Sequence, residues 1–274
     1  MKNFAALLTL VLVFGFTGSA SAQFAFKPDL PTTSFADVRA TAQQGDANAQ
    51  FNLGVMYADG HGVIQDDGQA IAWFRKAAEQ GLAVAQFRLG VMLEKGWGVA
   101  QDYAQALIWY RKAVAQGNAD AQNNLGAMYA QGWGVTQDSA QAADWFRKAA
   151  DQGIANAQYN LGVMYTSGQG VPQDNAQAIA WFRKAAEQGY VDAQYNLGAI
   201  YANGKAVAQD NIQAVSWFRK AAEQGYADAQ YALGEMYATG QGVAKNSTQA
   251  ATWFRRAADQ GNTAAKEALS KLEK

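Results

Sequence analysis

The stretch from Gly45 to Gln80 decides the fold of this 274-residue chain, and it reads GDANAQFNLGVMYADGHGVIQDDGQAIAWFRKAAEQ. Five further copies follow it, each displaced by 36 residues from the copy before. A fixed period of this length is the signature of a repeat protein, in which each unit buries its apolar face against the next unit. The register is kept by Trp73, Trp109, Trp145, Trp181, Trp217 and Trp253.

Each copy contains two helical patterns, which we call helix A and helix B. In the first copy, apolar residues over 47–58 share one helical face, and a second apolar stripe occupies 67–80. Helix B starts at an acid or amide followed three residues later by glutamine, as in Asp66 and Gln69, which is the spacing of a helix cap. It ends at a glycine such as Gly81, suited to the left-handed position after a helix. The pattern therefore predicts an all-α chain of helix pairs.

Glycines mark the places where the predicted helices meet and turn. One glycine follows the recurring leucine of every helix A, where a missing side chain would let helix B approach closely. Paired glycines such as Gly60 and Gly62 stand in the loops between helices A and B and indicate positive φ. In the fifth copy Ala206 replaces the second of these glycines. That loop therefore either carries about 1 kcal/mol of strain or takes a different turn.

The pattern as a whole resembles the Sel-one-like repeat (SLR) family, which is related to the tetratricopeptide repeats. It reads Ala-Gln-x-x-Leu-Gly-x-x-Tyr, then Gly-x-Gly-Val-x-x-Asp, then Ala-x-x-Trp-Phe-Arg-Lys-Ala-Ala-x-x-Gly, and it runs from Gly45 to Gly261 without a gap. The resemblance implies a right-handed α-solenoid of antiparallel helix pairs with the A helices on the concave side. Some members are cysteine-rich and linked to β-lactam binding, but this chain has no cysteine.

The first 22 residues have the pattern of a signal peptide. Lys2 supplies a positive charge, Ala5 to Phe16 form an apolar run, and small residues predict cleavage after Ala22. A single-span anchor is the alternative, but the run is shorter than the roughly 20 residues that a bilayer requires. We therefore expect a periplasmic or secreted protein with no integral membrane segment after cleavage.

The repeat register also predicts the domain organisation of the rest of the chain. Residues 23–33 form an extended leader, residues 34–45 a capping helix in the register of helix B, and residues 262–274 a capping helix in the register of helix A. Terminal units of a solenoid need a more polar outer face, and both of these segments have one. The six repeats are expected at 46–81, 82–117, 118–153, 154–189, 190–225 and 226–261.

Charge and composition argue against several classes of function. Cleavage removes one of 22 basic residues and leaves 21 against 23 acidic ones, so the main partner should be neither nucleic acid nor an anionic membrane, both of which require a basic excess. His61 is the only histidine and cysteine is absent, so no histidine-based metal site, Ser-His-Asp triad or thiol nucleophile can form. No phosphate-binding loop occurs, and no cofactor is expected. Only a carboxylate-only hydrolase stays formally open.

Comparison of the six copies separates the scaffold from candidate binding residues. The tryptophans of helix B recur in every copy and are interpreted as packing between repeats. The Arg-Lys pairs, such as Arg75 and Lys76, also recur and are interpreted as a solvated outer face near the carbonyl end of the helix. Positions that vary while their neighbours stay constant are free to serve a partner.

The first variable set lies on helix A, two residues and one residue before the recurring leucine. The resemblance places these positions on the concave face, where rings offer contact area and amides can hydrogen-bond an extended backbone. The alternative is that the rings pack onto the neighbouring A helix and the amides satisfy local carbonyls. The candidate residues are Phe51, Asn52, Phe87, Arg88, Asn124, Tyr159, Asn160, Tyr195, Asn196 and Tyr231.

The second variable set contains two tryptophans between loop glycines, Trp97 and Trp133, in adjacent copies. At a typical helix spacing they would lie about 10 Å apart on one rim and form a contact patch. The alternative is that each ring folds down over its own helix pair.

These observations predict a non-catalytic interaction scaffold: an adaptor of the cell envelope, monomeric, that binds a protein or extended peptide along the concave face. Two alternatives belong to other classes. One is an inhibitor or immunity protein that caps a toxic enzyme through Trp97 and Trp133. The other is a secreted factor that acts on a host or neighbouring cell.

Overall fold

The computed structural model describes residues 34–204 and 206–272, so the predicted signal peptide and extended leader lie outside the described residues. This part of the chain contains fourteen α-helices and no strand. It forms two compact units, residues 34–154 and 155–272. Within the described part, every helix is too short and too polar to cross a membrane.

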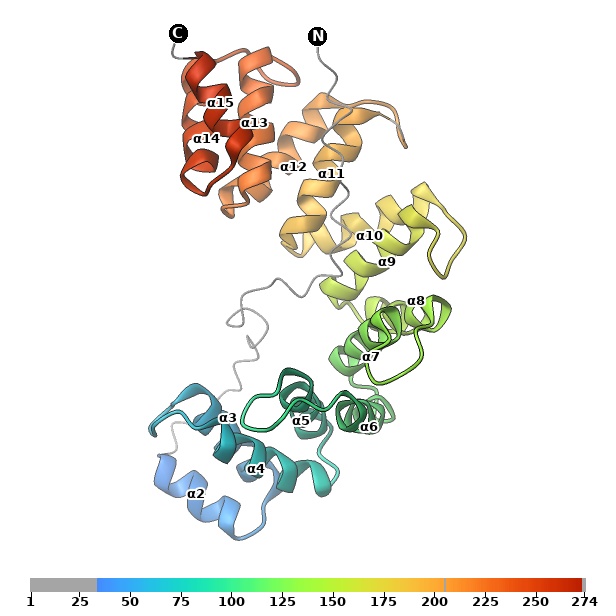
Figure 1. Ribbon diagram of the computed structural model, residues 1–274, viewed down its shortest axis with the longest axis vertical. Helices are drawn as coiled ribbons and strands as arrows, with labels where there is room; N and C mark the ends of the chain where they lie inside the picture. Colours follow the sequence, from blue (N-terminus) through green and yellow to red (C-terminus); the bar gives the residue numbers. More distant parts are fainter. Residues whose placement is uncertain (1–33, 205, 273–274) are drawn as a thin grey trace. The chain divides into compact units, whose positions relative to one another are not determined.

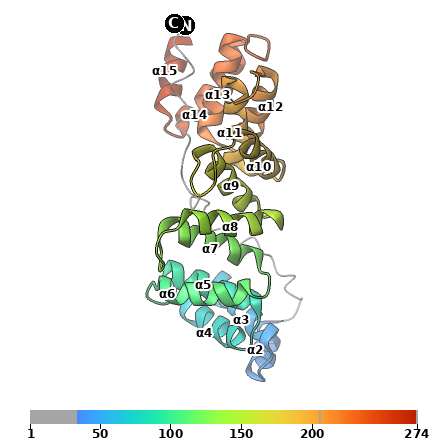
Figure 2. The same cartoon turned by 90° about the vertical axis from the view of Figure 1, so that its right-hand side faces the viewer.

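The first unit consists of three A–B pairs preceded by one helix (Figure 1). Each A helix packs against the B helix of its own copy, and each B helix packs against the next A helix of the unit. Figure 2 shows α5 beside α6 and α7 beside α8. The helices are α2 (Phe35–Gln43), α3 (Ala47–Asp59), α4 (Asp67–Glu79), α5 (Ala83–Lys95), α6 (Tyr103–Val114), α7 (Ala119–Gln131) and α8 (Ser139–Asp151).

The second unit repeats this arrangement and ends in one extra helix in the register of helix A. Its three A–B pairs are α9/α10, α11/α12 and α13/α14, and α15 packs against α14. The helices are α9 (Ala155–Ser167), α10 (Asn175–Glu187), α11 (Val191–Asn203), α12 (Asn211–Glu223), α13 (Ala227–Thr239), α14 (Ser247–Asp259) and α15 (Thr263–Leu272). The all-α solenoid of helix pairs expected from the sequence is confirmed.

The ends of the helices follow the predicted capping chemistry. The Asp66 carboxylate accepts a hydrogen bond of 2.9 Å from the backbone N–H of Gln69, as the spacing indicates. Helix α3 ends at Gly60, which has φ of 72°, in the left-handed region that glycine tolerates. Every residue with positive φ in the described part is a glycine, and because residue 205 lies outside the described residues, both outcomes expected at Ala206 stay predictions.

The core of each repeat is a ring pressed against a glycine. A Cβ atom added to Gly54 would lie 2.7 Å from the Phe74 ring, and the equivalent distance is between 2.5 and 2.8 Å in all six copies. These are distances that real Cβ atoms do not show, so only glycine fits at this position. The expected close approach of helices A and B is therefore confirmed. At this position the aromatic ring from helix B occupies the space that a side chain on helix A would otherwise fill.

A buried glutamine links each pair of helices and was not singled out in the sequence. Gln50 is only 6% exposed, and its amide donates to the carbonyl of Ala42 on the preceding helix B. Its side-chain oxygen accepts a 2.8 Å hydrogen bond from Gln80 at the end of its own helix B. The same bond, 2.7 to 2.9 Å long, joins Gln116 to Gln86, Gln152 to Gln122, Gln188 to Gln158, Gln224 to Gln194 and Gln260 to Gln230.

Candidate functional site

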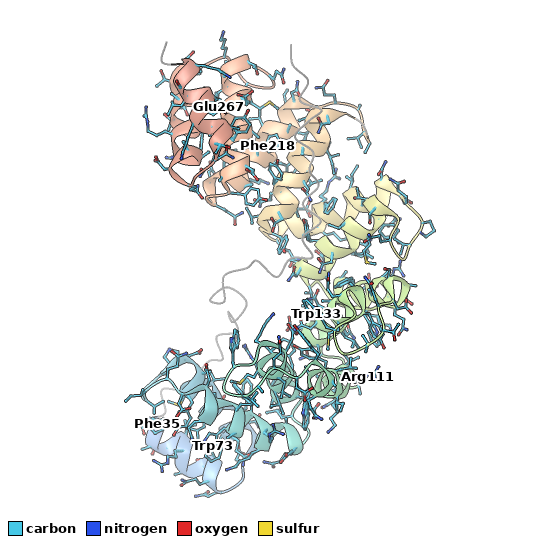
Figure 3. All side chains as sticks on the ribbon, viewed as in Figure 1. Phe35, Trp73, Arg111, Trp133, Phe218 and Glu267 are labelled. Atoms are coloured by element: carbon cyan, nitrogen blue, oxygen red, sulfur yellow. The ribbon has the colours of Figure 1, made fainter. Side chains whose placement is uncertain are left out.

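The recurring basic residues of helix B are engaged within the molecule. Lys76 Nζ lies 3.8 Å from the centroid of the Trp73 ring, one turn away on α4 (Figure 3), and every other copy places a lysine or arginine in the same way at 3.8 to 4.6 Å. Arg111 donates a 3.0 Å hydrogen bond to the hydroxyl of Tyr129 on the next A helix. Arg183 donates in the same way to the hydroxyl of Tyr201, and Arg219 to that of Tyr237, each on the next A helix. The Arg-Lys pairs therefore hold repeats together in addition to facing solvent.

The variable aromatic residues of helix A pack against the core ring of their own helix B. The rings of Tyr159 and Tyr195 also lie 5.0 and 5.2 Å from the rings of Tyr190 and Tyr226, the N-cap residues of the next A helices, so these two contact the neighbouring A helix, as one of the two alternatives expected. Phe51 and Tyr159 are buried, with 6% and 2% of their surface exposed, whereas Phe87, Tyr195 and Tyr231 are half-buried. Ring centroids lie 5.5 to 6.0 Å apart in the pairs Phe51–Phe74, Phe87–Tyr110, Tyr159–Phe182, Tyr195–Phe218 and Tyr231–Phe254.

The polar residues of the same series differ in burial from copy to copy. Asn52 and Asn124 are half-buried, and Asn160, Asn196 and Arg88 are buried. Burial lowers the pKa of the Arg88 guanidinium, and the nearby carboxylates of the A helices oppose that shift. A buried guanidinium of this kind is held as a charge by its acidic neighbours, so it contributes to the fold as well as to any contact surface.

Three buried side-chain amide atoms on A helices have no hydrogen-bond partner within residues 34–204 and 206–272. They are the Oδ1 atoms of Asn123 and Asn160 and the Nδ2 atom of Asn196. All three belong to the variable series that the sequence selected. Buried polar atoms in native proteins are nearly always paired, and an unpaired one costs about 1–3 kcal/mol. These atoms therefore mark the part of the A helices whose hydrogen bonding is incomplete.

A polar network replaces the apolar core where the second and third copies meet. The Tyr110 hydroxyl donates a 2.7 Å hydrogen bond to Glu94 Oε2 and accepts one of 3.0 Å from Asn124 Nδ2. Lys95 Nζ lies 2.8 Å from the other oxygen of Glu94, so this 2%-exposed carboxylate is paired on both sides. Burial, followed by the charge of Glu94, raises the pKa of Tyr110. The sequence gives an indication of this polar network, because Tyr110 occupies a position where the other five copies have phenylalanine.

The loop tryptophans are half-buried and packed against the core of the first unit. The Trp133 ring (labelled in Figure 3) stacks on Tyr103 with a centroid separation of 5.4 Å and an angle of 20° between planes. Tyr103 begins α6, the B helix of the preceding copy, so Trp133 does not fold over its own helix pair. Gly98, the residue after Trp97, lies against the backbone of Asp67 at the start of α4, which is the B helix of the preceding copy. Part of the Trp133 indole therefore serves the contact between successive repeats.

The family model for the Sel1 repeat matches six consecutive segments, residues 47–82, 83–118, 119–154, 155–190, 191–226 and 227–262. The chain belongs to the Sel1 repeat family. Sel1 repeats, like other solenoids, are scaffolds for protein interactions, and stacking of the units produces the extended surfaces that such proteins use. Among functionally curated proteins, none matches the sequence significantly.

Several solved structures contain Sel1 repeats in a similar arrangement. The protein c5321 of uropathogenic Escherichia coli, described as a protective antigen with an SLR fold, is 41% identical with a TM-score of 0.83 over 88% of this chain and 51% of that chain. The chain thus spans about half the length of that relative. A Sel1 repeat protein of Oxalobacter formigenes is 36% identical, with a TM-score of 0.60 over 87% of this chain and 79% of that chain. The immunity protein PA5088 of Pseudomonas aeruginosa, 22% identical with a TM-score of 0.53 over 80% and 82% of the two chains, shares the fold.

Proposed function

We propose that this protein is a non-catalytic adaptor of the cell envelope, periplasmic or secreted, that binds an extended segment of a partner protein along its A helices. The observation that carries the proposal is the pair of unpaired buried amide atoms on the A helices of the second unit, Asn160 Oδ1 and Asn196 Nδ2. They include both an acceptor and a donor, as does the backbone of an extended segment. A docked segment would pair them and recover the free energy that an unsatisfied polar atom costs.

The opposite side of the repeats supports this choice of surface. The charged residues of the B helices already contact tryptophan rings and tyrosine hydroxyls within the molecule, as Lys76 and Arg111 do. The A helices instead present residues that vary from copy to copy. The predicted cleavage after Ala22 is the basis for the proposed location. Trp97 and Trp133 are kept as a second proposed contact surface on the loop rim.

Recovery of partners on the purified mature chain tests this function. Alanine at Tyr159 or Tyr195 would remove core ring contacts, so an amide variant is the cleaner choice. Asn160 and Asn196 each have one unpaired side-chain atom. The double variant Asn160→Ala/Asn196→Ala removes both of these atoms, which have no well-formed hydrogen bond to lose. We expect it to fold and to recover much less partner from an envelope extract than the parent.

The matched control is Gln105→Ala, which deletes an exposed amide on the B helix α6. This control should recover as much partner as the parent. Full recovery by a folded Asn160→Ala/Asn196→Ala variant would reject the A helices as the binding surface.

A further inference from the structure

Two A helices of the second unit, α11 and α13, carry acidic residues and no basic ones. Helices α9, α11 and α13 contain neither lysine nor arginine, whereas their partners α10, α12 and α14 carry two basic residues each. In the first unit α5 mixes both signs, with Arg88, Glu94 and Lys95. We call a set of residues on α11, on α13 and at the N-cap of α13 the acidic tyrosine stripe. It comprises Asp192, Tyr195, Tyr226, Asp228, Tyr231 and Glu235.

The carboxylates of the stripe lie close enough to act on its tyrosines. The rings of Tyr195 and Tyr226 are 5.2 Å apart and tilted by 49°. Burial and the charge of Asp228 raise the pKa of Tyr195 to about 12. Burial and the charges of Asp192 and Asp228 raise the pKa of Tyr226. The stripe therefore holds negative charge beside aromatic faces, which is the combination that binds guanidinium and ammonium groups.

A cavity lies next to the stripe, within the last three helices of the second unit. It has a volume of about 360 Å³, and its walls include Tyr231, Glu235, Phe254, Glu267 and Lys271. The rings of Tyr231 and Phe254 form one wall, with centroids 5.7 Å apart. Two carboxylates against one ammonium leave the walls with one net negative charge. The cavity falls in the size range of ligand sites and offers an aromatic wall and an acidic end to a single long basic side chain.

An unpaired amide on the same face shows that the stripe is more than a group of acids. Asn196 follows Asp192 by one turn of α11, so the two share a helical face. Asn196 is 6% exposed, and its amide faces the Tyr159 hydroxyl, although its Nδ2 atom makes no well-formed hydrogen bond in the described part of the chain. Asn160, on the preceding A helix, is 4% exposed and leaves its Oδ1 atom unpaired. Backbone groups of a bound segment are the natural partners of these atoms.

We propose that the acidic tyrosine stripe selects a cationic extended segment of the partner, with one arginine or lysine side chain in the cavity beside Tyr231 and Glu235. This inference rests on the proposed function and adds the chemistry of the ligand. The amides of Asn160 and Asn196 hold the backbone of the segment, and the carboxylates of the stripe hold its basic side chains. An acidic segment would be repelled at the same place.

Binding of three labelled peptides to the mature chain tests the proposal. The peptides have equal length and differ only in carrying arginine, glutamine or glutamate at alternate positions. Fluorescence anisotropy at low and high salt should show the arginine peptide binding most tightly, with an affinity that falls as salt screens the charges. The variant Glu235→Gln should lower that affinity at least tenfold. Tyr231→Phe should keep most of it, because the ring is retained.

The matched control is Glu187→Gln, which removes the same charge from an exposed position of the B helix α10. Equal binding of the glutamine and arginine peptides would overturn the inference, as would absence of binding by all three. An effect of Glu187→Gln equal to that of Glu235→Gln would also overturn it, because net charge alone would then explain the result. If charge variants have no effect while Asn160→Ala/Asn196→Ala still loses the partner, the adaptor function stands and only the cationic selectivity fails.

Discussion

Replacing Gly198 by alanine should destabilise the protein, although alanine is the better helix former. Gly198 lies on α11 against the Phe218 ring of α12. An added Cβ would come within 2.5, 2.7 and 2.9 Å of three ring carbons. Carbon atoms at optimal contact lie about 3.5–4.0 Å apart, so the ring would have to retreat by about 1 Å.

Two opposing terms determine the size of the effect. Alanine in place of glycine in a helix interior stabilises by about 1 kcal/mol. Overpacking a core costs about 1–3 kcal/mol, and the upper end applies here because Phe218 is only 2% exposed. The Tyr195 ring lies 5.7 Å from Phe218 and limits its retreat. We therefore expect Gly198→Ala to lower the free energy of unfolding by about 2 kcal/mol.

Urea unfolding followed by far-ultraviolet circular dichroism measures this loss. The control is Gly68→Ala, a helical glycine on α4 whose added Cβ would meet only the flexible carboxylate of Asp66, at 3.2 Å. It should leave stability unchanged or raise it slightly. A second test is Gly198→Ala combined with Phe218→Leu, in which the shorter side chain should recover about 1–2 kcal/mol of the loss. Unchanged or increased stability of Gly198→Ala would refute the view that ring-on-glycine contact limits this position.

Three further predictions follow from the contacts between helices. Gln194→Ala should cost about 1–3 kcal/mol in urea unfolding because it removes the two hydrogen bonds of a buried side chain, whereas the exposed Gln213→Ala should change stability by less than about 0.5 kcal/mol; equal effects would contradict a stabilising role for the buried glutamine. Lys220→Ala should lower stability by about 0.5–1 kcal/mol through loss of its contact with the Trp217 ring at 4.1 Å, and Lys220→Arg should retain it, as thermal unfolding can show. Burial, followed by the charge of Asp228, raises the pKa of Tyr195 to about 12. The contribution of Tyr195 to stability is therefore present below the unfolded pKa of about 10 and is lost as pH rises to about 12. Tyr195→Phe should therefore lose less stability than the parent between pH 10 and pH 12, and an equal loss would argue against the shift.

Much of the fold was predictable because its determinants are local or strictly periodic. The cap at Asp66 depends on a residue three positions away, and the left-handed turn at Gly60 depends on that residue alone. The close approach at Gly54 follows from a missing side chain that recurs every 36 residues.

The candidate site was only partly predictable. Position relative to the recurring leucine identified the A-helix face, and three unpaired amide atoms lie in that series. It did not predict that Tyr159 would be 2% exposed and packed on Phe182, because the face of a helix says nothing about the direction in which a long side chain turns. The position of Trp133 on Tyr103 of the preceding copy was missed for the same reason.

The sequence by itself determined the number of repeats, the helix pairs, their caps and the glycine at each core contact, because each depends on residue type at a fixed spacing. Tertiary structure decided where the tips of long side chains meet. Gln80 and Gln50 are 30 residues apart, Arg111 and Tyr129 are 18 apart, and the two members of each pair come from different helices. Such pairs exist only after the helices have packed, and the same packing left Asn160 and Asn196 incompletely bonded. The residues that recur every 36 positions therefore determine the scaffold. The candidate binding surface consists of residues that vary between the copies and that packing of the helices brings together.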